Sequence, residues 1–399
     1  MVDPRPQSQA DVNFQNGQIG VTGRHAALLA FLMACGFLVV GQLYVTIPLV
    51  GDVAARFGIE AATATLTGSA FGFAYAAGFL IFGPLSDRHG RKRVIVLGLA
   101  VMALATVLVG LAPSFEALLA MRAIQGLAAS AFPPAALSLV AEELPPQHRP
   151  LGVSLMSFAF LGAAPLAQFF AVQTGGGLPT IMFELAPFYL AGAVGLFFVA
   201  KSETRRARAS SEERSSRLAS LIGDSGILAA WAAAVTVLFG FVSFHAGAQS
   251  LNPSLGVDLQ TLRIVGLPPM LLALAAAPVT RHCGATVTAR IGLLLSVLAI
   301  GLAIAGTPTV LLVASVLLSA GVALAVPGLI ATVAGRATNA NRGLALAVYS
   351  FCLFLGAGVA PPIAQALSGL GTVQLWLLPT VLLLAAALGI RQSKSPNPT

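Results

Sequence analysis

The chain has 399 residues, of which 57% are apolar and only 9% are charged. So few charges cannot cover the water-facing surface of the two or three soluble domains that this length would otherwise suggest. The net charge of +8 comes from basic residues in short segments between apolar runs, so no continuous nucleic-acid-binding face is expected.

Twelve apolar runs of about twenty residues follow in chain order, each long enough for a helix to cross roughly 30 Å of hydrocarbon. They lack the two-residue alternation of barrel strands, so helices are expected. The first run is too long for a removable signal and lacks a cleavage site, so we expect it to be retained. The predicted spans are His25–Ile47, Ala64–Gly83, Val94–Leu111, Phe115–Leu137, Leu151–Val172, Ile181–Ala200, Gly226–Ala248, Leu262–Val279, Ile291–Ala305, Val310–Val333, Gly343–Leu367 and Val373–Ile390.

The basic residues fix the expected orientation. With the start of the chain in the cytoplasm, Arg56 and Arg263 lie outside, Arg122 lies within a span, and the rest of the 22 Lys and Arg residues are cytoplasmic. We therefore predict a multi-pass protein of a bacterial-type inner membrane with both termini cytoplasmic. The predicted parts are a cytoplasmic segment 1–24, a six-helix bundle 25–200, a linker 201–225, a second six-helix bundle 226–390 and a tail 391–399.

The two predicted bundles carry the same local patterns at an offset of about 194 residues, which is typical of an internal repeat. Parallel repeats of this kind place a substrate site at their interface, and rocking of one half against the other exposes the site alternately. The matched residues are Pro84 and Gly90 with Pro278 and Gly284, Gly126 and Pro133 with Gly321 and Pro327, and Arg149 with Arg342.

The loop between the second and third predicted spans reads G-P-L-S-D-R-H-G-R-K-R, from Gly83 to Arg93. The positive-inside rule explains its basic residues, but it requires neither the acid at the helix end nor the two glycines seven residues apart. The segment resembles the signature loop of the major facilitator superfamily. That resemblance implies an all-α membrane fold with twelve transmembrane helices in two pseudo-symmetric six-helix bundles. It also implies a conformational latch to the helices of the other half, formed by Gly83, Asp87, Arg88, Gly90 and Arg91, with Asp87 meeting the start of helix 11.

Helix 4 carries a second match. The run from Arg122 through Gln125 and Gly126 is similar to a motif of the proton-coupled drug and sugar efflux branch, which includes arabinose efflux permeases. A charge inside a span costs about 2.5–3.5 kcal/mol unless it meets water or a partner, so Arg122 is expected to face the cavity. Its expected role is electrostatic, on coupling or on anionic substrate. The alternative is a structural arginine bonded to helix-end carbonyls.

The sequence shows no carboxylate at the middle of a predicted span, where a proton-coupled carrier would normally have one. Glu184, near the outer end of helix 6, is the candidate partner of Arg122. Asp52 and His245 fall at repeat-related outer positions and form a possible outer gate, although a histidine bonded to backbone is the simpler interpretation.

Polar side chains inside apolar spans are expected to face the interior, because lipid offers them no partners. Their sparseness suggests a weakly polar substrate, although several could form interhelical hydrogen-bond pairs instead. The possible cavity-lining residues are Gln42, Tyr44, Tyr75, Gln168, Tyr349 and Gln365.

These patterns predict a monomeric secondary transporter that works by alternating access and exports small drug-like or sugar-like molecules in exchange for protons. The proton gradient would be the energy source, and no cofactor or metal is expected, because Cys35, Cys283 and Cys352 are widely spaced. No enzyme is predicted, since no embedded nucleophile or phosphate loop is found. The alternatives are proton-coupled uptake of a sugar or organic acid, and a membrane sensor or assembly factor that transports nothing.

Overall fold

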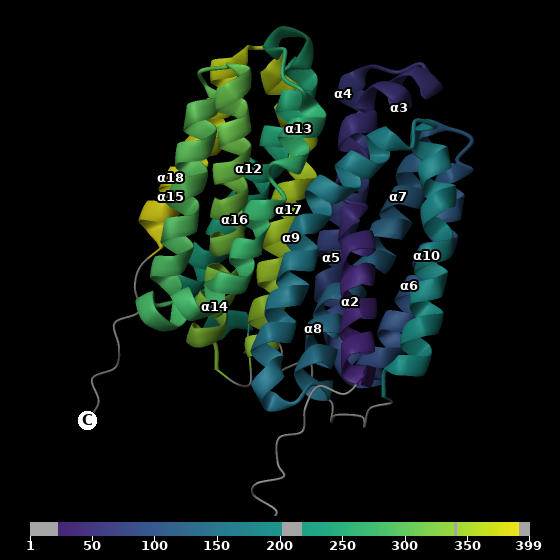
Figure 1. Ribbon diagram of the computed structural model, residues 1–399, viewed down its shortest axis with the longest axis vertical. Helices are drawn as coiled ribbons and strands as arrows, with labels where there is room; N and C mark the ends of the chain where they lie inside the picture. The colour runs from purple at the N-terminus through teal and green to yellow at the C-terminus, as the bar shows by residue number, and fades with distance from the viewer. Residues whose placement is uncertain (1–22, 202–217, 339–340, 391–399) are drawn as a thin grey trace, which may run out of the picture.

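A computed structural model describes residues 23–201, 218–338 and 341–390. The described residues contain twelve helical spans that are long and apolar enough to cross a membrane, as the sequence predicts. The long helices run side by side in a bundle, with the first half of the chain on one side and the second half on the other (Figure 1). The predicted linker 201–225 and both terminal segments lie largely outside the described residues.

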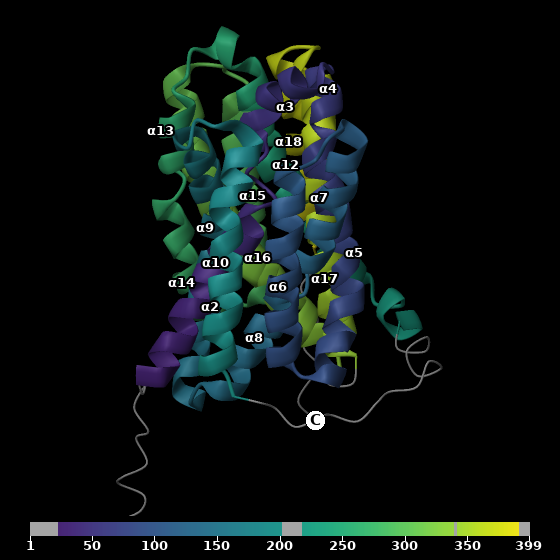
Figure 2. The same cartoon turned by 90° about the vertical axis from the view of Figure 1, so that its right-hand side faces the viewer.

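The first half begins at α2, and Gly or Pro stands at many of its helix ends. Its short helices α3 and α4 lie at one end of the bundle, which we call the distal end (Figures 1 and 2). The elements are α2 (Gly23–Gly41), η1 (Ile47–Leu49), α3 (Val50–Phe57), α4 (Ala61–Ala64), α5 (Leu66–His89), α6 (Arg91–Gly110), α7 (Phe115–Ala129), α8 (Phe132–Glu143), η2 (Pro146–His148), α9 (Arg149–Gln173) and α10 (Gly177–Val199).

The second half repeats this order of six spans. Because twelve spans alternate in direction, α2 begins and α18 ends at the same end of the bundle, which we call the terminal end. The elements are α12 (Ser225–Leu255), α13 (Leu259–Ile264), η3 (Pro268–Leu271), α14 (Leu272–Cys283), α15 (Ala285–Ala303), α16 (Pro308–Arg336), α17 (Arg342–Ser368) and α18 (Thr372–Gly389).

Helix packing separates a lipid-facing surface from an interior shared by both halves. Large apolar side chains such as Phe198 and Leu388 are 78% and 72% exposed, as expected for a surface that lipid covers. Within the halves, α6 packs on α10, α12 on α17 and α15 on α16. Between the halves, α5 packs on α17 and α9 on α14. The interface between the halves therefore runs through helices two, five, eight and eleven of the twelve.

One pair of predicted repeat positions has the same backbone geometry in both halves. Gly90 ends α5 with φ +90° and ψ 139°, and Gly284 ends α14 with φ +88° and ψ 151°. Each glycine makes a sharp turn into the next span in a conformation that other residues adopt rarely. The predicted correspondence of Gly90 with Gly284 thus reflects the same turn in both halves.

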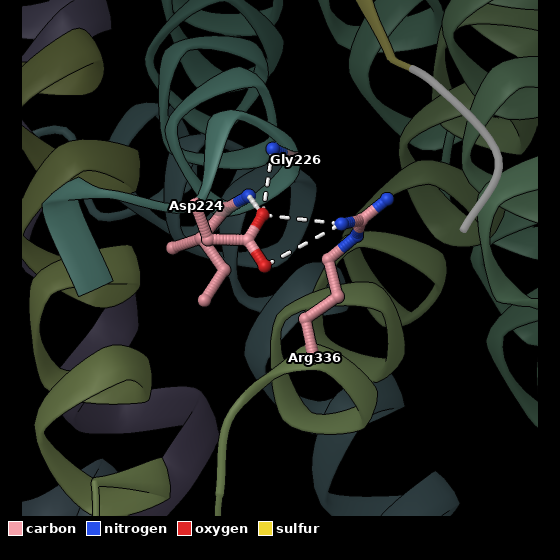
Figure 3. Close-up of polar contacts among 4 residues, drawn as sticks. Asp224, Gly226 and Arg336 are labelled. Carbon is pink, nitrogen blue, oxygen red and sulfur yellow. Dashed lines mark hydrogen bonds and ion pairs between the residues drawn. The ribbon is translucent and has the colours of Figure 1, made fainter. Parts of the chain in front are cut away.

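An ion pair ties the first span of each half to the fourth, with the charges exchanged between halves. In the first half Arg24 donates to Glu143 at 2.6 Å. In the second half Arg336, at the end of α16, reaches Asp224, just before α12, at 3.1 Å (Figure 3). Asp224 Oδ1 also accepts from the backbone N–H of Gly226, at 2.8 Å, so it caps α12 as well. The acid thus has two separable roles.

Those two roles predict a graded response at Asp224. Asp224→Asn keeps a good cap but loses a partly exposed ion pair, so the expected cost is about 0–1 kcal/mol. Asp224→Ala loses both interactions and should cost about 1–2 kcal/mol. Tryptophan fluorescence during thermal unfolding reports on this half, because both tryptophans, Trp231 and Trp376, lie in it. Equal losses in the two variants would show that the cap contributes nothing, and Asp52→Ala, an exposed acid in the other half, is the control.

Candidate functional site

The first span is interrupted deep inside the bundle. The sequence predicts one helix to Ile47, but α2 ends at Gly41 and residues 42–46 form turns before η1. The second span is likewise divided at Thr65, between α4 and α5. Such breaks leave backbone carbonyls without helical partners, and in a membrane those groups must be satisfied by the protein itself.

Arg122 of α7 donates to a carbonyl in the broken segment of the first span and to one in the first turn of α5. It is fully buried, and its Nη2 donates to Gln42 O at 2.8 Å while its Nε donates to Thr67 O at 3.2 Å. Its Nη1 donates to Gln125 Oε1 at 2.6 Å and to Gln42 Oε1 at 3.2 Å. The guanidinium also lies 4.5 Å from the centre of the Phe71 ring, a cation–π contact. One cation therefore joins the first, second and fourth spans.

The two glutamines extend the hydrogen-bond network from Arg122 to further residues. Because arginine only donates, both amide oxygens face it and both amide nitrogens donate onward. Gln42 Nε2 donates to Tyr189 Oη at 2.9 Å, and Gln125 Nε2 donates to Thr106 Oγ1 at 2.8 Å. The Tyr189 and Thr106 hydroxyls then donate to the backbone oxygens of Leu38 and Met102. We call Arg122, Gln42, Gln125, Tyr189 and Thr106 the Arg122 network.

The Arg122 network contains no carboxylate. No carboxylate is among the described groups that contact Arg122, so backbone and amide oxygens and the Phe71 ring surround the positive charge. Arg122 does not line the cavity described below. The arrangement matches the structural alternative, an arginine bonded to carbonyls at helix breaks. Gly126 allows the close approach of α7 to α5, since a Cβ there would lie 2.3 Å from Phe71 O.

An aromatic stack leads from this network to the other half. Phe71 and Tyr75 of α5 have ring centres 5.5 Å apart, and Tyr75 lies 4.6 Å from Phe354 of α17. One turn away, a Cβ on Gly72 would lie 2.7 Å from Gly358 Cα, so the two helix backbones nearly touch. The Tyr75 hydroxyl is buried without a hydrogen-bond partner among the described residues. The contact between α5 and α17 is thus close and largely apolar.

A cavity of about 240 Å³ lies between the halves toward the distal end. Its walls come from the break in the first span, from α4 and α5, and from α12 and α17 of the second half. We call it the distal cavity. Its polar lining residues are Thr46, Thr65, Gln249, Ser250 and Gln365.

The other residues predicted to line a cavity serve mainly in packing. Tyr44 makes an edge contact with Phe241 of α12 across the halves, with ring centres 6.2 Å apart. Gln168 donates to Ala164 O within its own helix, and Tyr349 donates to Val326 O. Gln42 belongs to the Arg122 network and Tyr75 to the aromatic stack, so of this predicted set only Gln365 lines the distal cavity.

The predicted latch is only partly described. The Asp87 side chain lies outside the described residues, so its contact with the start of helix 11 stays a prediction. Arg88 is exposed, whereas Arg91 is buried and forms an ion pair with Glu142 at 3.1 Å. The Gly83 backbone faces α17, since a Cβ there would lie 3.9 Å from the Ala347 side chain.

Glu184 does not pair with Arg122, and His245 has the simpler, backbone-bonded arrangement that the sequence favours over an outer gate. Glu184 is exposed on α10 and accepts a hydrogen bond from Thr174, so it does not reach the buried Arg122. Asp52 is exposed on α3, whereas His245 is buried and its Nδ1 lies 3.0 Å from Phe241 O within α12. The side of a helix on which a charge lies decides both cases, and uniformly apolar spans give little indication of that side.

Comparison with known proteins identifies the family. The family model of the Major Facilitator Superfamily matches residues 32–281 and 261–398, which together cover most of the chain. The chain belongs to the major facilitator superfamily. Two solved structures have the same fold over 93% of this chain: the human organic anion transporter MFSD10 (TM-score 0.73, 18% identity, all of that chain) and a bacterial homolog of the human lysosomal transporter Spinster (TM-score 0.70, 16% identity, 97% of that chain).

Curated superfamily relatives match over shorter stretches. An uncharacterized MFS-type transporter of Bacillus subtilis, YwfA, is 31% identical over 39% of each chain. Multidrug resistance protein 3 of the same organism is 31% identical over 37% of this chain and 29% of its own. The methylenomycin A resistance protein of Streptomyces coelicolor is 31% identical over 47% of this chain and 38% of its own. The matched segments thus span less than two fifths of each relative's length.

Proposed function

We propose that this superfamily member moves small molecules across a cell membrane by alternating access, as an exporter that exchanges them for protons. The observation that carries the proposal is the distal cavity, because residues of both halves line it and a movement of one half against the other would open or close it. The names of two relatives, a multidrug and a methylenomycin resistance protein, support export as the direction.

The interface between the halves supports movement. Alternating access needs contacts that can exchange at low cost, and aromatic and glycine surfaces fulfil this better than ion pairs do. Within each half, by contrast, the Arg122 network and the ion pairs Arg24–Glu143 and Asp224–Arg336 join several spans. Each half therefore has the internal connections of a body that can move as a unit.

Vesicles with an imposed pH gradient test the direction and the coupling. The purified chain is reconstituted, a compound that stabilises it thermally is added, and internal pyranine reports proton movement. Exchange predicts that the compound and protons move in opposite directions and that collapsing the gradient stops accumulation. Accumulation of the compound together with protons would contradict export, and thermal stabilisation without flux of either would contradict transport.

A further inference from the structure

The distal cavity offers a hydrogen-bond donor whose orientation is fixed from behind. Arg263 of α13 is 3% exposed, and its Nη2 donates to Gln249 Oε1 at 2.6 Å. An arginine can only donate, so the amide oxygen of Gln249 must face it. Gln249 lines the cavity and makes no other side-chain hydrogen bond to the described residues. Its Nε2 therefore has two N–H groups available to a ligand.

The other polar groups of the cavity complement this donor. Thr46 is 4% exposed, and its hydroxyl caps no helix although it stands at the start of η1. Gln365 Oε1 accepts from Ser250 Oγ at 2.6 Å, and the Gln365 amide nitrogen has no hydrogen-bond partner among the residues that the structure describes. The Ser250 hydroxyl also lies 3.0 Å from Ala246 O, so only the Gln249 orientation is enforced by a group that cannot accept. No carboxylate is among the described residues that line the cavity.

The local charge favours a negative ligand. Arg263 forms no ion pair within the described part of the chain. Asp258 lies close enough for a longer-range electrostatic attraction. Asp258 instead caps α13, and hydrogen bonds from the Thr261 hydroxyl and the Gln260 N–H hold the pKa of its carboxyl below its ordinary value. Asp52 and Glu60 lie beside lining residues but are exposed, where water and salt screen them. A buried cation is screened much less.

We propose that the distal cavity binds a small organic anion, whose acceptor oxygens take hydrogen bonds from Gln249 Nε2 and the Thr46 hydroxyl while Arg263 supplies the positive charge behind them. This assignment rests on the proposed transport function, since it names the substrate class that would enter between the halves.

Ligand binding to the purified full-length chain tests the assignment without any transport step. Benzenesulfonate serves as the anionic probe, because it stays ionised at every working pH. Benzenesulfonamide is its neutral counterpart and benzylammonium its cationic one. Thermal stabilisation as a function of probe concentration gives the dissociation constant of each. We expect benzenesulfonate to bind at least about tenfold more tightly than the other two, the ratio expected from one hydrogen bond to a charged group.

The Gln249→Glu variant replaces the hydrogen-bond donor of this side chain by an acceptor while it keeps the side-chain shape. The new carboxylate would pair with Arg263 and replace the donor by an acceptor, so benzenesulfonate binding should weaken about tenfold to a hundredfold. Gln249→Met removes the donor alone and should weaken binding by a smaller factor. Gln374→Glu makes the same exchange at an exposed position of α18 outside the cavity lining and should leave binding unchanged.

Three results would overturn the assignment. They are equal binding of all three probes, tighter binding of benzylammonium, and unchanged benzenesulfonate binding in folded Gln249→Glu protein. If Gln249→Glu does not fold, the probe series on the parent chain and on Gln249→Met still decides. If another compound shows proton-linked flux but the binding of the probes shows no preference for the anion, the anion assignment fails and the proposed transport stands. Selective anion binding with no flux in vesicles would refute the proposed transport and leave the site.

Discussion

Gly72→Ala is expected to reduce the transport rate at least about tenfold while leaving membrane insertion intact. The added Cβ would lie 2.7 Å from Gly358 Cα, and a helix backbone cannot move aside as a flexible side chain can. The helices α5 and α17 would have to separate, which disturbs the Tyr75–Phe354 contact at 4.6 Å. Overpacking of this kind typically costs 1–3 kcal/mol, and here the cost falls on the contact about which the halves would move.

A matched glycine provides the control for that variant. Gly335 lies inside α16, and a Cβ there would meet nothing within 4 Å. Gly335→Ala should therefore be neutral or stabilising, by up to about 1 kcal/mol from helix propensity. Initial transport rates in vesicles and thermal unfolding midpoints are measured for both variants. Parental rates in Gly72→Ala, together with a stability gain like that of Gly335→Ala, would show that the close contact has no role in movement.

Arg122→Met is expected to lower both stability and transport. Four hydrogen bonds are lost, and at the roughly 0.6 kcal/mol that such bonds average in membrane proteins the loss is about 2 kcal/mol. The Gln42 carbonyl would lose its donor and the bond that ties Thr67 O to α7 would also be lost, so the first and second spans should loosen. Transport should fall because the link from Phe71 to Tyr75 and Phe354 loses its fixed end.

One further variant separates charge from hydrogen bonding at this position, and a second controls for the loss of an arginine. Arg122→Lys keeps the charge but has three donors on one atom, so it should recover part of the stability. Arg281→Met removes an exposed arginine at the end of α14 and should change neither quantity. If Arg122→Met unfolds at the same temperature as Arg281→Met, the network contributes no measurable stability. If only proton coupling is lost while stability stays, the electrostatic role expected from the sequence holds instead of the structural one.

The sequence predicts the spans well because hydrocarbon thickness fixes their length. All twelve predicted runs correspond to helical spans, and the turns at Gly90 and Gly284 follow from the repeat. It does not predict the breaks inside spans. The run to Ile47 is mostly apolar on both sides of Gly41, so its composition does not predict that α2 ends there. The break becomes understandable only once Arg122 is seen to bind the freed carbonyl of Gln42.

The candidate site is harder to predict, for two physical reasons. In lipid both faces of a helix are apolar, so hydrophobic periodicity does not show that Glu184 points outward and Arg122 inward. The second reason is a helix boundary, because the sequence predicts that the seventh span ends at Ala248 whereas α12 continues to Leu255. The sequence therefore places Gln249 and Ser250 in a loop. The sequence places Arg263 at the outer end of the eighth span, but it does not show that this residue is 3% exposed in a divided span beside the cavity.

The proposed transport requires the two halves to move against each other about the contact between α5 and α17. Spin labels can follow both ends of the bundle in a chain in which Cys35 and Cys352 are replaced by Ala. The distal pair is Asp52→Cys with Gln374→Cys in a Cys283→Ser background, and the terminal pair is His89→Cys with the native, exposed Cys283. Double electron–electron resonance spectroscopy then gives the distance distribution of each spin-label pair in nanodiscs at pH 5.5 and at pH 8.

Rocking predicts opposite changes at the two ends. A shift in pH, or addition of a compound that stabilises the protein, should lengthen the distal distance while it shortens the terminal one, or the reverse. Gly72→Ala should reduce both changes. Distances that stay single and constant at both ends under all these conditions, in protein that transports, would contradict movement of the halves about this contact.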